Sequence, residues 1–238
     1  MVLKRFILLA LLAACPALAN TLIVNGVDTS LGMGSLGTGS VWIHEDKTWV
    51  PGDTGGSNVL VQWAGAIDIT VDSYVRQVFC VQLFTDIGFG TYNTTMDFSD
   101  TPNLERLGWL LQNEFPVGQV AGAAFQLAVW DIIEDNGDGF GTATKTAGTV
   151  SQSTDPSNPT SSAVLTAAVK YEADSLGKTS DYGAVYHNFL GATPMQNLMG
   201  TPVTDGGPSP APEPSAIFLM IGGLALIGLG RLRIGRRG

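Results

Sequence analysis

The chain has 238 residues, with 21 acidic and 12 basic side chains and a formal net charge of −9. So acidic a surface repels phosphate backbones, which excludes nucleic acid as an expected partner. The length between the two terminal segments described below suits one domain with a hydrophobic core of its own.

Residues 1–19 have the pattern of a secretory signal peptide. A basic start at residues 4–5 precedes a short apolar run, and Ala-Leu-Ala at 17–19 offers a signal peptidase site. The run is too short to span a bilayer. A lipoprotein cleavage box ending at Cys15 is the alternative, but a proline directly follows this cysteine. We predict cleavage after Ala19 and export.

The first part of the body, residues 21–91, is rich in β-branched residues and glycine. Strict alternation at 66–72 places Ile67, Ile69 and Val71 on one face, as in a half-buried strand. The pattern predicts strands over 40–45, 58–64, 66–72 and 74–84. Both faces of the last strand are apolar near Cys80, which indicates a central position in the sheet.

Helical periodicity replaces this alternation after residue 100. Thr101 or Asp100 can cap a first helix that begins with Pro102 and carries leucines at helical spacing. A second helix over about 120–134 is apolar nearly all round, as expected of a buried helix. A third helix runs from about 162 to 176, and a last strand is predicted over 182–190.

The segment EDNGDGFG after the second helix has some features of a calcium loop. Glu134, Asn136, Asp138 and Gly139 fall at suitable offsets, but Lys145 occupies the twelfth position, where a bidentate acid is required. We interpret the segment as a turn and expect no metal and no cofactor. The fold class predicted for the body is α+β, mainly an antiparallel sheet or sandwich with a helical insertion. Helices are expected for the leader and the C-terminal apolar run.

The C-terminal end resembles the PEP-CTERM sorting signal. A Pro/Gly linker at 201–211 precedes Pro212, Glu213 and Pro214, and an apolar run and an arginine cluster complete the segment 212–238. The resemblance implies a Gram-negative bacterium that makes exopolysaccharide, with an exosortase that removes the tail. It implies a precursor held in the inner membrane by the C-terminal helix and a mature protein at the cell surface or in the extracellular matrix.

Without the leader and the tail, six basic and twenty acidic residues remain, so the body carries a formal charge of about −14. Cys80 is then its single cysteine, and an odd cysteine in an exported protein needs an explanation. It can be an inert buried thiol, a dimer cross-link, a nucleophile beside His187, or a metal ligand. The two histidines, His44 and His187, make a poor ligand set with one cysteine.

Gln126 stands on the apolar second helix, where a buried amide without hydrogen bonds costs on the order of 1–3 kcal/mol. An amide bonded to the backbone is the ordinary explanation. A thiol placed beside it permits another, because attack of sulfur on the amide carbon expels ammonia and leaves a thioester. That step needs donors aimed at the oxyanion and a dry site.

The residues around this pair resemble the internal Cys–Gln thioester domains of bacterial surface adhesins. Phe79-Cys80-Val81 is similar to their cysteine motif. Phe125-Gln126-Leu127-Ala128-Val129-Trp130 is similar to their glutamine motif, Thr-Gln-x-Ala-Ile/Val-Trp, although Phe125 stands in place of the threonine. The resemblance covers about residues 60–190 and implies a thioester-domain-like body over 20–200.

The implied function is adhesion by single-use acylation rather than enzymatic turnover. An amine or a glycan hydroxyl on a partner attacks the acyl carbon of Gln126, and Cys80 leaves as a thiol. Phe79 and Trp130 would shield the site, and Asp131 either steers the nucleophile or is a surface acid without a role. A non-reactive structural protein of the exopolysaccharide or biofilm matrix, a structural staple and a cysteine hydrolase remain alternatives.

Overall fold

The computed structural model describes residues 20–37, 39–46, 56–98, 101–140 and 149–201. Ten strands and three helices are found in these residues, and the predicted α+β class is confirmed. They are β1 (Asn20–Met33), β2 (Trp42–Glu45), β3 (Ser57–Leu60), β4 (Ala64–Val71), β5 (Tyr74–Cys80), β6 (Gly90–Phe98), α2 (Pro102–Asn113), α3 (Gln119–Asp135), β7 (Val150–Gln152), α4 (Ser162–Ser175), β8 (Ala184–Leu190), β9 (Thr193–Pro194) and β10 (Leu198–Gly200).

Six strands form a closed antiparallel barrel in the order β10-β5-β4-β1-β6-β8. The short strand β10 closes it, because Leu198–Gly200 pairs with β5 on one side and with β8 on the other. The antiparallel pairing was predicted, as a sheet or sandwich, but its closure into a barrel was not. Closure leaves β5 without a free edge, so Cys80 lies on a strand that is bonded to neighbours on both sides.

The barrel core is formed by the alternating side chains that the sequence predicts. Ile67, Ile69 and Val71 are all buried, and Val78 and Cys80 of β5 belong to the same cluster. Phe79 lies on the opposite face of β5 and joins a second cluster with residues of the three helices. The strand with two apolar faces therefore separates two parts of the core.

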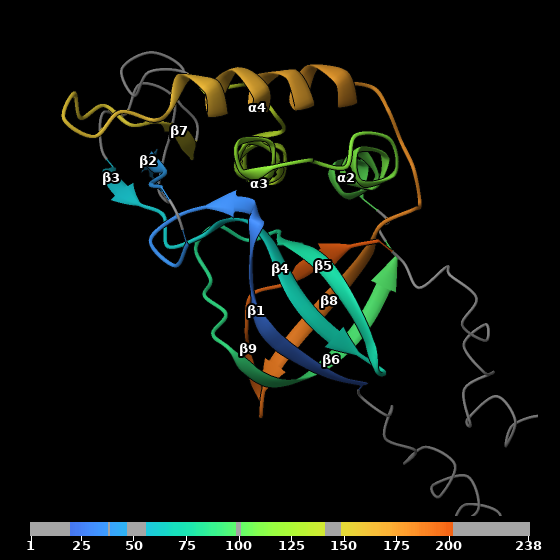
Figure 1. Ribbon diagram of the computed structural model, residues 1–238. Helices are drawn as coiled ribbons and strands as arrows, with labels where there is room; N and C mark the ends of the chain where they lie inside the picture. Colours follow the sequence, from blue (N-terminus) through green and yellow to red (C-terminus); the bar gives the residue numbers. More distant parts are fainter. Residues whose placement is uncertain (1–19, 38, 47–55, 99–100, 141–148, 202–238) are drawn as a thin grey trace, which may run out of the picture. The chain divides into compact units, whose positions relative to one another are not determined.

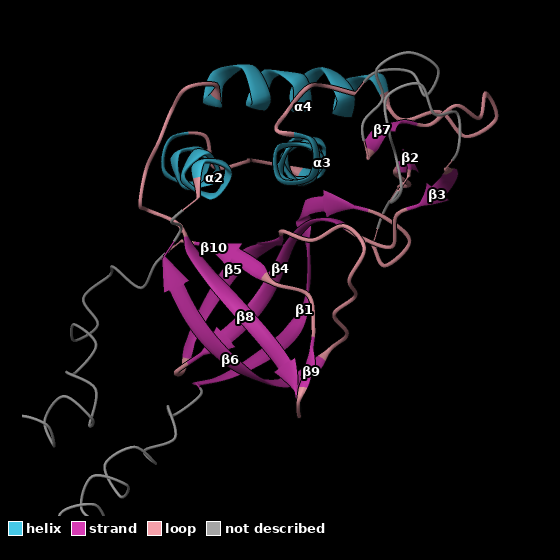
Figure 2. Cartoon of the chain, turned by 180° about the vertical axis from the view of Figure 1, so that it is seen from behind, coloured by secondary structure: helices cyan, strands magenta, loops and turns pink. Residues whose placement is uncertain are grey.

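The helices form two layers above the barrel (Figures 1 and 2), with α2 and α3 next to it and α4 across them. Thr101 caps α2 through its side chain, as predicted. Gly122 lets α3 come against β1, because a Cβ at this position would lie 2.1 Å from the Leu31 carbonyl oxygen. This close approach brings the side chain one turn further along α3, at position 126, to the end of the barrel.

A small antiparallel sheet, β3-β2-β7, stands beside the barrel and contacts α3 through β7. The predicted strand at 40–45 is shorter in the structure, and the one at 58–64 ends as β3 at Leu60. β1 and β6, both long barrel strands, were not predicted as separate elements.

The leader 1–19 and the sorting segment with Pro212, Glu213 and Pro214 lie outside the described residues. The same holds for the helices expected there. Among the residues that the structure describes, no helix is long and apolar enough to cross a membrane.

Candidate functional site

The side-chain amide of Gln126 is bonded at both ends to the backbone of Cys80. Gln126 Oε1 accepts a hydrogen bond from the Cys80 N–H at 3.0 Å, and Gln126 Nε2 donates to the Cys80 carbonyl oxygen at 2.7 Å. Gln126 is completely buried and Cys80 is 6% exposed. The two residues that the sequence assigns to one site therefore lie in contact, 46 positions apart in the chain.

The amide takes the place of a missing strand partner. The ladder between β4 and β5 runs from Val71↔Tyr74 to Ile67↔Val78. Two residues further along β5, Cys80 faces Leu198 of β10 on one side. On its other side the carboxamide supplies the acceptor and the donor that the backbone of a strand would have offered. A buried backbone N–H and C=O are thus both satisfied.

The thiol of Cys80 is not activated in this environment. Burial, and after it the negative charge of Asp86, raises the pKa of the Cys80 thiol to about 12. The thiol is therefore protonated at neutral pH, and attack on an amide requires a base that removes its proton. Asp86 is the carboxylate whose charge acts on the sulfur.

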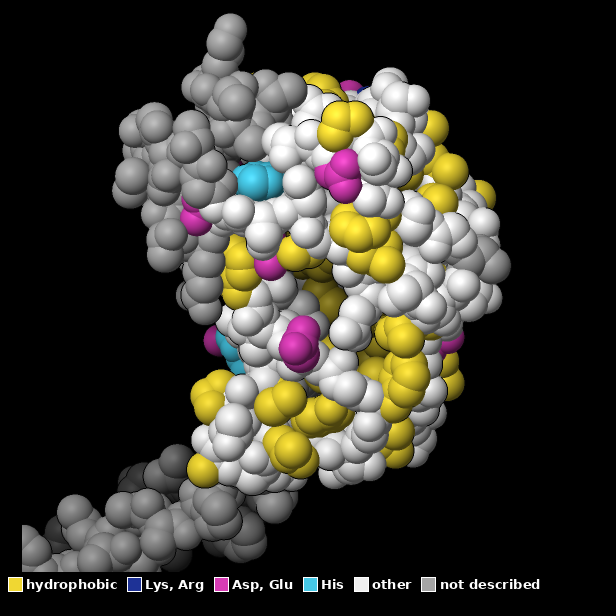
Figure 3. All heavy atoms as spheres, turned by 90° about the vertical axis from the view of Figure 1, so that its left-hand side faces the viewer, with side chains coloured by type: hydrophobic (Ala, Val, Ile, Leu, Met, Phe, Trp, Pro, Cys, Tyr) yellow, Lys and Arg dark blue, Asp and Glu magenta, His cyan; other side chains and the backbone are white. Residues whose placement is uncertain are grey.

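Cys80 lines a pocket of about 450 Å³ between the barrel end, the small sheet and the segment 81–89. Most of its lining residues are apolar, and Glu45 and Asp86 are the acids that line it. Figure 3 shows the hollowed face, with apolar side chains inside the hollow and acidic side chains beside it. Burial raises the pKa of Glu45, and the charge of Asp86 contributes to the rise. The pocket thus offers a route from solvent to the sulfur past two acids.

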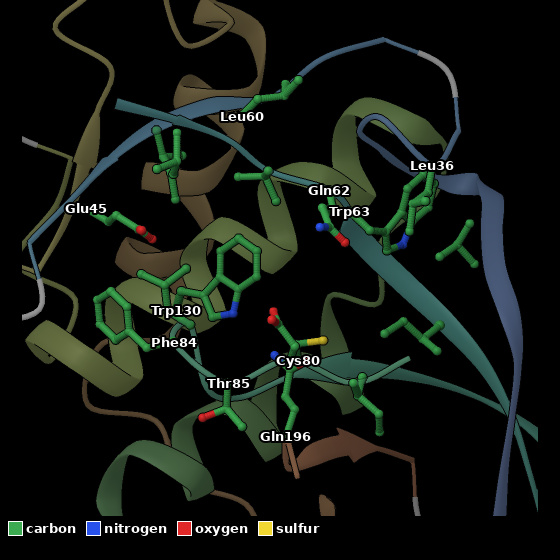
Figure 4. A pocket seen from close by; sticks show the side chains of 18 of the residues that line it. Leu36, Glu45, Leu60, Gln62, Trp63, Cys80, Phe84, Thr85, Trp130 and Gln196 are labelled. Atoms are coloured by element: carbon green, nitrogen blue, oxygen red, sulfur yellow. The ribbon is translucent and has the colours of Figure 1, made fainter. Parts of the chain in front are cut away.

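Two further polar side chains line this pocket near Cys80 (Figure 4). The indole N–H of Trp130 is buried and has no hydrogen-bond partner. Gln196 donates through Nε2 to the Gln82 carbonyl oxygen at 2.5 Å. Trp130 belongs to the motif found in the sequence, whereas Gln196, Glu45 and Asp86 were missed. Asp86 and Gln196 lie on irregular segments without a periodic pattern that could have indicated them. Glu45 ends the strand predicted over 40–45, but nothing in the sequence connected this strand with Cys80.

The remaining motif residues pack around the pair. Phe125 is completely buried and lies against Phe79 and Tyr171, with ring centroids at 4.5 and 5.3 Å. It belongs to the cluster on the helix side of β5, whereas Ala128 and Trp130 belong to the barrel-side cluster with Cys80. The side chain at position 125, where the related motif has threonine, therefore points away from the pocket.

The other candidate residues lie apart from this pocket. Neither His44 nor His187 lines it, so the structure brings no imidazole into it beside Cys80. Asp131 does not line it either. The interpretation of Asp131 as a surface acid is wrong, because its side chain is completely buried at the far end of α3. The chain turns there with Asn136 in the left-handed region, as the predicted turn requires.

A second set of buried polar groups surrounds Asp131. Its Oδ2 accepts from the Gly139 N–H at 3.1 Å, but its Oδ1 has no partner. Glu172 of α4 is 5% exposed, and its Oε1 also has no partner. Burial is the main cause that raises the pKa of Asp131, to about 7, and of Glu172, to about 9; nearby carboxylates add to both. At neutral pH Glu172 therefore favours its protonated form, whereas Asp131 is divided between its protonated and ionised forms.

We compared the chain with family models, curated proteins and solved structures, and found no match in any of the three.

Proposed function

We propose that the chain is an exported surface or matrix protein in which Cys80 and Gln126 form an internal thioester that attaches it once to a partner. The observation that carries the proposal is the two-point bond between the Gln126 amide and the Cys80 backbone. It holds the amide carbon beside the residue whose sulfur has to attack it.

The contacts supply the groups that the first step needs. Sulfur adds to the amide carbon, the thiol proton passes to a base and from the base to Nε2, the C–N bond breaks, and ammonia leaves. The Cys80 N–H already points at Oε1, so its hydrogen bond strengthens as negative charge develops on that oxygen. Asp86, whose charge acts on the Cys80 thiol, is the proposed base. Because this donor comes from the backbone, the reaction does not depend on a hydroxyl at position 125.

The second step joins the partner. An amine or hydroxyl enters through the pocket and adds to the acyl carbon; the C–S bond breaks, and Cys80 regains a proton from the nucleophile. The acids Glu45 and Asp86 favour a cationic amine over a neutral hydroxyl by attraction at the entrance, and the amine gives its extra proton to one of these carboxylates before it attacks. The free indole N–H of Trp130 can bind an acceptor of the partner. Export, exosortase processing and a biofilm location belong to the same proposal and are supported by the terminal motifs.

A structural role is the second candidate, because a carboxamide bonded at both ends to backbone is also what a purely packing amide does. Intact mass distinguishes the two. A thioester makes the purified chain lighter by one ammonia than its sequence requires, and methylamine then adds to Gln126 with release of one thiol.

Two controls make this measurement decisive. Cys80→Ala should have full mass and should not react with methylamine, and glycerol should react more slowly than methylamine with the unmodified chain. Thiols have to be counted after unfolding, since the buried sulfur resists alkylation in either case. Full mass together with one titratable thiol per chain, in protein without the leader that contains Cys15, would favour the structural role.

A further inference from the structure

We propose that the turn after α3 and the facing side of α4 form a calcium site, with Asp131, Asp135, Asp138 and Glu172 as its carboxylate ligands. The first observation is convergence. Asp131, Asp135 and Asp138 each offer a carboxylate oxygen, and these oxygens lie within 4.8 Å of one another. Carboxylate oxygens are the ligands that calcium prefers.

Glu172 provides an independent observation from a different element. It comes from α4, it is almost completely buried, and its Oε1 has no hydrogen-bond partner. Its Oε2 would lie 3.9 Å from a Cβ built on Gly139, and the charges of Asp131 and Asp138 both act on it. The carboxyl group therefore faces the cluster. It also lies beside the Asp131 carboxyl group, and no N–H or O–H group of the described residues donates to its Oε1. Two buried carboxyl groups side by side require a proton or a cation between them.

Among the described residues, basic side chains do not bind the carboxylates of this cluster directly. The charge of Arg106 acts on Asp131 and Glu172, but its hydrogen bonds go to Ser175 Oγ and to the carbonyl oxygens of Asn136 and Glu172. In the described part of the chain the ion pair found is Lys170–Asp174, and none of the four acids belongs to it. Asp135 accepts hydrogen bonds from the Thr149 and Val150 N–H groups at 2.8 Å each, which satisfies its oxygens but does not neutralise its charge. A proton shared by Asp131 and Glu172 would remove one charge and leave those of Asp135 and Asp138 without a cation.

The geometry suits a hard divalent cation that keeps some water. Asp131 and Glu172 form a buried side, whereas Asp138 is exposed and leaves the other side open to solvent. Gly137 and Gly139 have φ values of +72° and +94°, which allow the chain to wrap around this point. Nitrogen and sulfur ligands are absent among the four residues, which argues against zinc. The set differs from the offsets of a calcium loop, because one ligand lies on another helix.

Calcium bound here would tie the end of α3 to the turn and to α4. The site shares no residue with the pocket around Cys80. The inference thus stands or fails independently of the thioester.

The test uses the purified full chain after treatment with a chelator. Calcium chloride is titrated at neutral pH, with binding followed by calorimetry and the melting temperature followed in parallel. We expect one site with a Kd of about 1 mM or tighter, as in extracellular calcium modules, and a rise in Tm of several degrees. Magnesium should bind more weakly, because it gives up water reluctantly.

Asp131→Asn and Glu172→Gln keep the shape of the side chains and should each weaken calcium binding by roughly 10-fold or more. Asp181→Asn, which removes an exposed acid elsewhere, is the matched control and should bind like the unmodified chain. The proposal is overturned if the unmodified chain shows neither heat of binding nor a Tm change with about 10 mM calcium. Unchanged binding in both ligand variants would overturn it as well, since the ion would then bind elsewhere.

Discussion

Gln126 and Asp131 lie five residues apart on α3, and both are completely buried. Their polar atoms differ in how many hydrogen-bond partners they have. The amide of Gln126 finds a donor and an acceptor in the backbone of one residue. Asp131 keeps one oxygen without a partner and faces a second buried acid in the same condition. Burial alone therefore does not define a polar residue's role. A neutral group can be completed by the chain itself, whereas an incomplete acid needs a proton or a cation from outside.

The largest effect is expected for Gln126→Leu, which removes both hydrogen bonds between the Gln126 amide and the Cys80 backbone. The apolar side chain has a similar volume but leaves the Cys80 N–H and C=O without partners inside the core. We expect a loss of about 2–5 kcal/mol in the free energy of unfolding, measured by urea denaturation. The variant should be made in a Cys80→Ala background, because a thioester would add its own cross-link of up to about 4 kcal/mol.

The matched control is Gln112→Leu on the exposed face of α2, where a change within about 0.5 kcal/mol is expected. If Gln126→Leu had as small an effect as this control, the two hydrogen bonds would not position the amide. The geometric support for the thioester would then be lost.

The Cys80–Gln126 site could be predicted from sequence to a large extent, because Cys80 and Gln126 each lie on an element with a clear pattern. Apolar residues on both faces near Cys80 indicated a central strand, and a helix over 120–134 that is apolar nearly all round indicated a buried one. What the pattern could not give is β10, three residues long, whose pairing with β5 and β8 closes the barrel. For the same reason the pocket residues Gln196 and Asp86 were missed.

The acidic cluster around Asp131 could not be predicted, although the sequence analysis considered a calcium loop in the neighbouring residues. The loop offsets selected Glu134, Asn136 and Asp138, whereas the structure brings together Asp131, Asp135 and Asp138. Glu172 of α4 lies beside Asp131. Spacing along the chain can predict ligands that all come from one continuous loop. It carries no information about a helix that returns from residues 162–175 to place a fourth acid against the turn.

A change of pH should alter the stability contributed by Asp131 and Glu172 at one end of α3 but not that contributed by the neutral Gln126 amide. In the chelated protein Asp131 and Glu172 have folded pKa values above their unfolded values of about 4. The folded state therefore binds more protons. The stability from these groups is complete below about pH 4 and is lost as the pH rises through about 7 and about 9. We expect Tm to fall by roughly 5 °C between about pH 5 and about pH 9.

The double variant Asp131→Asn, Glu172→Gln isolates this contribution, because it keeps Asp135, Asp138 and Arg106 in place. Its Tm should fall less over the same pH range, and calcium should flatten the curve of the unmodified chain only. Curves that run parallel with and without the two acids would show that the pH dependence comes from the general negative charge of the body.

The smallest effect on stability is expected for Asp138→Asn, which tests whether the solvent-exposed side of the acidic cluster binds the ion. Asp138 is exposed, so in chelator the free energy of unfolding should change by less than about 0.5 kcal/mol. Calcium affinity should still fall several-fold, because one charged ligand becomes a neutral one. Stability and ion binding are thus predicted to separate at this residue, as they do not at Asp131, where the buried oxygen is involved in both. A chelated Asp138→Asn protein that melted well below the unmodified chain would mean that Asp138 supports the turn itself. The open side of the proposed site would then have to be formed by other groups.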